Sequence, residues 1–221
     1  MSTTRLRSFC PAALGALLLA ACSGPPSGPT RSEVRSVEAF HAIEFRGNGE
    51  ARITVGKSQS VTLTSDADAL PDVVTKVEKG LLIVEHSKGL WFQRPALRLQ
   101  IDMPAIDSVA IDGGAAVTIE NMTGPRLALV LGGAGTLRAS GEVGALDARL
   151  DGAGTLELAE LRAGDASVSV NGAGSIEVQV SGQLEATVNG VGSITYSGQP
   201  REVVRHVNGV GAISPAGNPK P

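Results

Sequence analysis

The stretches "VNGAGSIE" (170–177), "TVNGVGSIT" (187–195) and "VNGVGAIS" (207–214) write one short motif three times. Related corners occur earlier in the chain, at intervals of 18 to 20 residues. So regular a period indicates stacked units, each burying its apolar edge against the next. Aligned on the second residue of each corner, the six repeats give Gly114, Gly133, Gly152, Gly172, Gly190 and Gly209.

Between the corners, polar and apolar residues alternate, as in "ASVSV" (166–170) and "LEATV" (184–188). Alternation of this kind, rich in Val, Ile, Leu and Thr, is typical of strands of about five residues. Two all-β arrangements fit a break every nine or ten residues. One is an antiparallel meander with Asn-Gly at its hairpin tips. The other is a parallel β-helix in which each 19-residue unit forms one coil.

The residue between the two glycines favours the β-helix, because it is small and apolar where a hairpin tip would be polar. We expect the side chain at this position to turn into the core; the residues concerned are Ala134, Ala153, Ala173, Val191 and Val210. The residue before the first glycine is expected to form a hydrogen-bonded polar ladder, while the glycine lets neighbouring coils approach closely. The ladder residues are Asp151, Asn171, Asn189 and Asn208, and their glycines are Gly152, Gly172, Gly190 and Gly209.

Residues 36–110 are less regular but also rich in strand patterns. Gly47-Asn48-Gly49 looks like a divergent corner, and residues 67–80 are expected to contain a short helix whose start is limited by Pro71. Strands are predicted at "LLIVEHS" (81–87) and "ALRLQIDMP" (96–104). No linker separates this segment from the repeats. We therefore predict one domain over 36–215 that is continuous with the stack, followed by a disordered tail over 216–221.

The first 21 residues have the basic start, apolar core and small-residue end of a secretory signal peptide. The sequence Leu19-Ala20-Ala21-Cys22 resembles the lipobox of bacterial lipoproteins, which implies cleavage before Cys22 and acylation of that cysteine. An ordinary signal peptide that happens to contain Cys22 is the alternative. Residues 22–35 are expected to form a flexible tether. Ser23 in place of aspartate favours the outer membrane, and the face that the protein would occupy stays open.

Cleavage before Cys22 would determine which disulfides the mature chain can form and what net charge it carries. Cys10 leaves with the signal peptide and Cys22 carries lipid, so no disulfide forms within one chain. Loss of Arg5 and Arg7 leaves 17 basic residues against 22 acidic ones, a net charge of −5. An acidic chain is a poor match for phosphate backbones, which argues against a nucleic-acid partner.

Candidate catalytic and metal-binding residues are sparse. His41, His86 and His206 are far apart in sequence and have no acidic or serine companion at a recognisable spacing. No Gly-x-Ser-x-Gly elbow and no cluster of metal ligands occurs, so no cofactor or metal is predicted. Glu157 and Glu177 are expected at matching outward positions on adjacent coils. Such an acidic row fits a solvated strand face or, as an alternative, an enzyme that cleaves polysaccharide.

One aromatic stretch is a candidate contact surface. Leu90, Trp91 and Phe92 lie between Lys88 and Arg94, in a chain with one tryptophan and one tyrosine. These side chains either contact a partner, a glycan or lipid headgroups, or fold back to cap one end of the stack.

Three features together resemble the GIN-domain family of bacterial envelope proteins, often described as putative autotransporter-adhesin head domains. They are "FHAIEFRGNGEARITVG" (40–56), "MPAIDSVAIDGGAAVTIEN" (103–121) and the run of Asn-Gly corners. The resemblance implies a single-stranded, right-handed parallel β-helix. It carries over no catalytic residue.

The expected function is therefore non-enzymatic. We expect an outer-membrane lipoprotein that is held in the membrane by its N-terminal lipid. Its rigid surface would bind a protein or glycan that the sequence does not identify. A structural or scaffolding subunit that associates with itself through an exposed coil end is the alternative.

Overall fold

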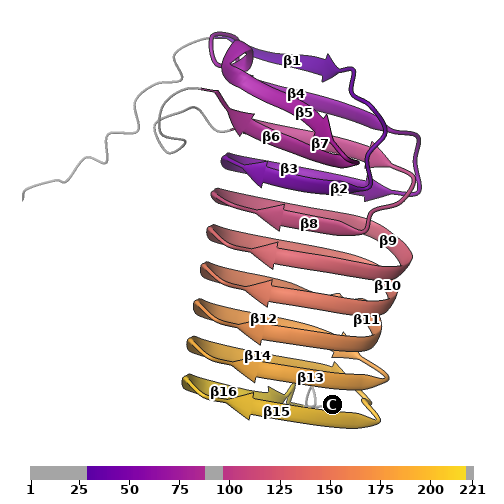
Figure 1. Cartoon of the computed structure of the whole chain (residues 1–221), viewed down its shortest axis with the longest axis vertical. Helices are drawn as coiled ribbons and strands as arrows, with labels where there is room; N and C mark the ends of the chain where they lie inside the picture. The colour runs from indigo at the N-terminus through magenta and orange to yellow at the C-terminus, as the bar shows by residue number, and fades with distance from the viewer. Residues whose placement is uncertain (1–28, 88–96, 218–221) are drawn as a thin grey trace, which may run out of the picture.

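The computed structural model describes residues 29–87 and 97–217, and 76% of the structure is β-strand. Figure 1 shows them as a tall stack of coils with an irregular region above it. The predicted all-β fold is confirmed, since the chain forms a solenoid of about five turns from stacked parallel strands. Within the described residues, no helix combines the length and the apolar character needed to cross a membrane.

The solenoid has two broad faces, and each coil adds a strand to both of them. Neighbouring strands within the repeats pair in parallel on both faces. The first face contains β3 (Asn48–Val55), β9 (Gly114–Leu131), β10 (Ala134–Leu150), β11 (Ala153–Val170), β12 (Ala173–Val180), β14 (Val191–Gly198) and β16 (Val210–Pro215). The second contains β2 (Ala42–Arg46), β8 (Ser108–Ile111), the later halves of β9 to β11, β13 (Gln183–Val188) and β15 (Glu202–Val207).

Three of the strands are longer than the alternation predicts. β9, β10 and β11 have 18, 17 and 18 residues and continue from one face of the solenoid to the other. The β10–β11 pairing keeps one register across the bend between the faces, from Val143–Ala163 to Ala145–Asp165, and its one register shift lies earlier, between Arg138 and Ser140. In these three coils only the glycine corner breaks the strand, so each strand contains one full coil. The next two coils are also broken at the bend, between β12 and β13 and between β14 and β15.

The side chain between the corner glycines points outward, contrary to the prediction. Ala134, Ala153 and Ala173 are exposed, and Val191 and Val210 are 59% and 71% exposed. The strict alternation of inward and outward residues explains this result. Leu150 points into the core. Counted from it, the alternation places Gly152 and Gly154 on the inner side of the corner and Ala153, between them, on the outer side. The parallel coils are therefore real, but the argument that favoured them was wrong.

The corner alignment is also wrong at the first repeat, by one residue. Gly133 lies in register with Gly113 rather than Gly114, and Ala134 N donates to Gly113 O over 2.7 Å. The divergent corner at Gly47 is confirmed as the preceding one, because Gly114 N donates to Gly47 O over 2.9 Å. The coil that begins at β2 is thus the first of the stack.

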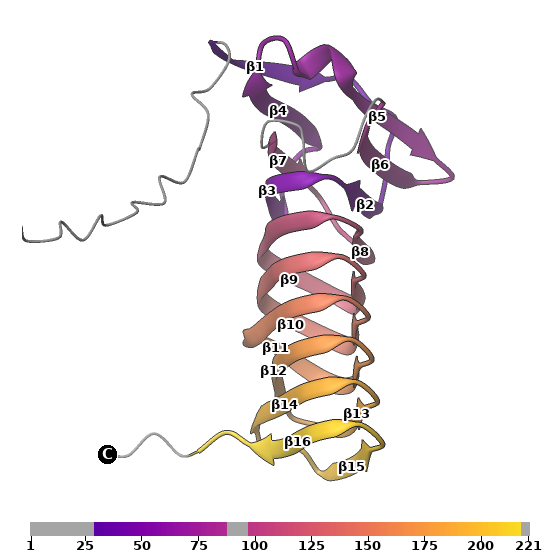
Figure 2. The same ribbon diagram turned by 90° about the vertical axis from the view of Figure 1, so that its left-hand side faces the viewer.

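The N-terminal segment continues the first face as predicted. β7 (Leu97–Met103) pairs in parallel with β3, and β4 (Ser60–Asp66) then pairs antiparallel with β7. The core runs through both parts as one cluster, from Phe40 in this segment to Ile213 in the last coil. Figure 2 shows this region covering the upper end of the stack.

One local prediction in this segment is wrong. The expected helix within 67–80 is reduced to a three-residue 3₁₀ turn, Leu70–Asp72, and the residues after it form β5 (Val73–Glu78). β5 pairs antiparallel with β6 (Leu81–His86) through a two-residue turn, Lys79-Gly80, in which both φ angles are positive. Such a turn matches the twist of a tight hairpin.

The expected flexible tether over 22–35 is wrong for its last six residues. Residues Thr30–Arg35 form β1, which pairs antiparallel with β4, and Ser32 Oγ lies 2.8 Å from Thr64 Oγ1. Val34 in this strand is 71% exposed. Backbone pairing rather than burial holds β1, so hydrophobic patterning gave no sign of it.

Candidate functional site

Four residues singled out in the sequence lie outside the described residues. They are the lipidation candidate Cys22 and the aromatic stretch Leu90, Trp91 and Phe92. The signal peptide over 1–21 lies outside them as well, as do residues 218–221 of the predicted tail. The site is therefore built from the coils.

The polar corner ladder runs along one edge of the stack. Each amide donates to the side-chain oxygen of the coil before it, and the N···O distances are 2.9, 2.8 and 2.7 Å along Asn208, Asn189, Asn171 and Asp151. All four side chains are exposed. Because each donor meets an acceptor within the protein, the ladder holds the coils in register instead of presenting free groups to a ligand.

The glycines beside the ladder are required by close backbone packing. A methyl group on Gly172 would overlap the carbonyl oxygen of Gly152, and the same conflict recurs along the stack. The corner glycines concerned are Gly152, Gly172, Gly190 and Gly209. Ladder and glycines thus have a structural role at this corner.

The two glutamates proposed as an acidic row do lie in register on adjacent coils. Glu157 of β11 pairs with Glu177 of β12 on the first face. Arg138 of β10 donates two hydrogen bonds to Glu157, and these bonds raise the pKa of the guanidinium. Both oxygens of Glu157 are therefore engaged by a permanent cation, which suits an ion pair on a strand face better than a general acid.

The histidines do not form a catalytic group with one another. His41 and His206 are exposed and His86 is half-buried. His41 does have an acidic companion that the sequence spacing hid, because its Nδ1 lies 3.0 Å from Asp107 Oδ2. Both of these side chains are well exposed, so the pair is a surface contact. Across residues 29–87 and 97–217, no group of three His, Cys, Asp or Glu side chains is placed to hold a metal ion.

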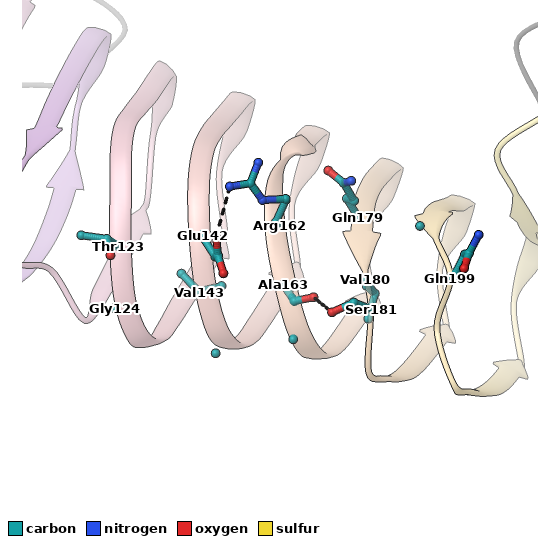
Figure 3. A pocket seen from close by; sticks show the side chains of 13 residues that line it. Thr123, Gly124, Glu142, Val143, Arg162, Ala163, Gln179, Val180, Ser181 and Gln199 are labelled. Carbon is teal, nitrogen blue, oxygen red and sulfur yellow. Dashed lines mark hydrogen bonds and ion pairs between the residues drawn. The ribbon is translucent and has the colours of Figure 1, made fainter.

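A groove of about 700 Å³ crosses the coils at the bend opposite the Asn-Gly corner. Figure 3 shows its residues arranged coil after coil, with polar side chains along one row and small residues along the next. We call it the side groove. Its polar row comprises Thr123, Glu142, Arg162 and Gln179, and Gln199 lines the groove beyond Gly198, outside this row.

The polar row follows the register of the strands. Glu142 pairs with Thr123 on one side and with Arg162 on the other, and Arg162 pairs with Gln179. Arg162 Nη2 donates to Glu142 Oε2 over 3.1 Å, and these side chains are 67% and 69% exposed. Glu142 and Arg162 are the two charged residues in the described lining, so the groove has no net charge.

The next row of the side groove consists of backbone and small side chains. Gly144 and Gly164 stand at the bend, and Ser181 Oγ donates to Ala163 O over 3.2 Å. A Cβ on Gly144 would lie 2.7 Å from Pro125 O, so coil packing itself requires the missing side chain. The sequence analysis missed this groove. Its signal was available, because Thr123, Glu142 and Arg162 repeat with the same 19 to 20 residue period.

Solved structures share this fold. A putative adhesin from Bacteroides fragilis has a TM-score of 0.71 at 21% identity, with 86% of this chain and 99% of that chain covered. A putative adhesin from Parabacteroides merdae has a TM-score of 0.53 at 17% identity, covering 86% of this chain and 98% of that one. At these identities the likeness concerns the fold. No curated protein matches the chain.

The family comparison reaches further along the sequence. The family model described as "Putative auto-transporter adhesin, head GIN domain" matches residues 39–200, which span every coil but the last. The match begins just before β2 and includes β4 to β7 of the strands that cover the stack, but not β1. The chain therefore belongs to the GIN-domain family of auto-transporter adhesin head domains.

Proposed function

We propose that this protein is a lipid-anchored adhesin-like module of the bacterial cell envelope, and that its coil stack acts as a rigid binding surface. Membership of the GIN-domain family is the observation that carries the proposal. A parallel solenoid suits this role, because many backbone hydrogen bonds fix the outer side chains at constant spacing before any partner arrives.

The anchor rests on the sequence at the N-terminus. Leu19-Ala20-Ala21-Cys22 follows a short apolar run, and acyl chains on Cys22 would hold the protein at a membrane through about 0.8 kcal/mol for each buried CH₂ group. With the lipid on Cys22, the N-terminal strands that cover the stack would then lie nearer to the membrane and the last coil farther from it. The groove and both faces would stay accessible to partners.

The anchor is tested by fractionation of cells that express full-length protein. Cys22→Ser should move the protein from the membrane pellet to the soluble fraction and abolish incorporation of radiolabelled palmitate. Cys10→Ser is the matched control, because Cys10 is removed with the signal peptide and its loss should change neither result. Equal pelleting of wild type and Cys22→Ser would contradict lipid anchoring.

Binding is tested separately with the purified Cys22→Ser protein, which lacks only the lipid. This protein should bind intact bacterial or host cells saturably, as measured by flow cytometry with a labelled sample. Absence of saturable binding to either kind of cell would contradict the adhesion role and leave the anchor unaffected.

A scaffolding role is the second candidate, and one observation favours it. β15 and β16 form the last coil of the stack and pair on one side only, with β13 and β14. Unpaired strand edges can accept another chain. This candidate predicts self-association through the last coil.

A further inference from the structure

We infer that the side groove binds an extended, uncharged glycan chain that lies across the coils. This inference rests on the adhesion role proposed above and assigns it a site and a ligand class. The groove spans the coils from Thr123 to Gln199, and with parallel strands about 4.8 Å apart each of the four coils from Thr123 to Gln179 adds one polar side chain to the row. That spacing is close to the length of one pyranose unit in an extended chain.

The chemistry of the polar row matches hydroxyl groups. Thr123 carries a hydroxyl and Gln179 an amide, each of which both donates and accepts, and Gln199 adds a further amide beside the row. Sugar hydroxyls also donate and accept, so each coil can exchange hydrogen bonds with one sugar unit. Glu142 and Arg162 bond to one another but are more than two-thirds exposed, so each keeps hydrogen-bonding capacity toward the groove.

The charge of the lining argues against an anionic polymer. One carboxylate and one guanidinium lie 3.1 Å apart, and they cancel in the field that a ligand would meet. A polyphosphate, a nucleic acid or a uronic-acid chain needs several unpaired cations along its length. The described lining offers none, because its one cation, Arg162, is paired with Glu142.

The backbone of the groove argues against a peptide. Extended peptides gain affinity by adding to an open sheet edge, where main-chain groups are free to pair. Here the strands on both sides are already paired: β10 with β9 and β11, and β11 with β10 and β12. At the bend, Ser181 N donates to Ala163 O and Gly182 N donates to Gly164 O. A peptide would find side chains but few free main-chain partners.

The small row gives the chain room to lie close to the coils. Gly144 and Gly164 have no side chain, and Val143 and Ala163 beside them point into the core. Packing of successive coils requires these glycines, and the groove is a consequence of that packing. A flat floor beside a periodic polar row is thus built into the fold.

The test uses two variants with matched controls, all in the Cys22→Ser background. Thr123→Val and Gln179→Leu each remove one polar group from the groove. Thr195→Val on the first face and Gln183→Leu on β13 make the same chemical changes outside the groove lining. Circular dichroism and thermal unfolding should confirm that all four variants fold as the wild type does.

Binding is measured on a printed array of neutral, acidic and amino-sugar oligosaccharides, with an array of unrelated peptides as a second arm. Wild type should retain linear neutral glycans, and each groove variant should bind them about three- to ten-fold more weakly, the value of one lost hydrogen bond. Both controls should match wild type. Equal binding by groove and control variants, retention of peptides only, or no retention of any glycan would overturn the inference.

The result is separable from that of the proposed function. If wild type binds intact cells but the groove variants bind them equally well, the groove inference fails and the adhesion role stands. If wild type does not bind cells at all, the adhesion role itself fails.

Discussion

The two ends of the solenoid are finished in different ways. At the N-terminal end, β7, β4 and β1 extend the first face beyond the coils, and β6 and β5 extend the second. These added strands bury large side chains, among them Phe40, Leu63 and Leu70. At the C-terminal end the stack stops at β15 and β16, with nothing packed on the last coil within the described residues.

The last coil differs from the others in what it turns inward. Arg205 occupies the position whose counterparts in earlier coils are Ala186, Val168, Ala148, Leu129 and Val109. Its neighbour in the inward row, Val207, is 47% exposed. Extra strands thus complete the core at the N-terminal end, whereas at the C-terminal end the core stops at the charged side chain of Arg205. An inward-pointing charge is a known means of blunting a strand edge.

The largest expected effect comes from opening the core at the covered end. Leu63 is fully buried in β4, and Leu63→Ala should lower the free energy of unfolding by about 2–5 kcal/mol, since it removes a packed side chain and leaves a cavity. Ile213 in the last coil is 9% exposed and faces the open end. Ile213→Ala should therefore cost about 2 kcal/mol or less, at the low end of that range.

Urea denaturation followed by circular dichroism measures both variants against wild type. If both cost the same, the last coil would be as tightly enclosed as the N-terminal end, and the contrast between the two ends would be wrong.

The second effect tests how much the coils depend on glycine at the corner. Gly172 lies between two coils, and the added methyl group of Gly172→Ala would overlap backbone oxygens of the coil before it. Overpacking of this kind costs about 1–3 kcal/mol. Gly209→Ala meets the same kind of contact, with Gly190 O, but within the described residues no coil packs on the other side of the last one, so it can shift outward.

Thermal unfolding should therefore show a larger loss for Gly172→Ala than for Gly209→Ala. Gly217→Ala is the control that should have no effect, because its Cβ would meet nothing within 4 Å. Equal losses at Gly172 and Gly209 would show that the corner is rigid even where one neighbour is missing.

The same corner shows what the sequence could and could not reveal. The period and the alternation predicted stacked strands but left a meander and a parallel β-helix open, and the family resemblance implied the parallel form. The Asn-Gly repeats placed Asn171 next to Asn189 in successive coils. The direction of Ala153 was wrong because apolar character was read as burial, whereas alternation counted from Leu150 gives the outward side. The first corner was one residue out because "DGGAA" offers two glycines, and only the pairing of Gly113 with Gly133 decides between them.

The ends of the stack were harder to predict than its middle. β1 is polar and is held by backbone bonds to β4, so no pattern of burial reveals it. β5 follows Pro71, and its short run of residues fits a helix or a strand equally well until β6 pairs with it. The side groove depends on a bend that β10 and β11 pass without a break, and a bend inside a continuous strand has no turn motif.

The smallest expected effect on stability, and the sharpest test of the contrast between the ends, is Arg205→Leu. Arg205 is exposed, so the substitution should change the free energy of unfolding by no more than about 0.5 kcal/mol. It would, however, join Val203, Val207 and Ile213 into one apolar end surface beside two free strand edges. Sedimentation velocity should show wild type as a monomer and Arg205→Leu as a dimer. Arg149→Leu, the same change at an outward position of β10, should stay monomeric.

The covered N-terminal end explains why the Arg205→Leu variant should form a dimer and not a larger assembly. Because added strands cover the N-terminal end, only two C-terminal ends can meet, and a contact between identical surfaces closes as a two-fold dimer instead of growing into a fibre. A wild type that already associates through its last coil would favour the scaffolding role. It would also contradict the proposal that Arg205 prevents association at the open end. An Arg205→Leu variant that remains monomeric at the same concentration would show that the free edges of β15 and β16, rather than the arginine, fail to support pairing. A wild-type monomer with a dimeric variant would mean that one charged side chain keeps the open end from serving as an interface.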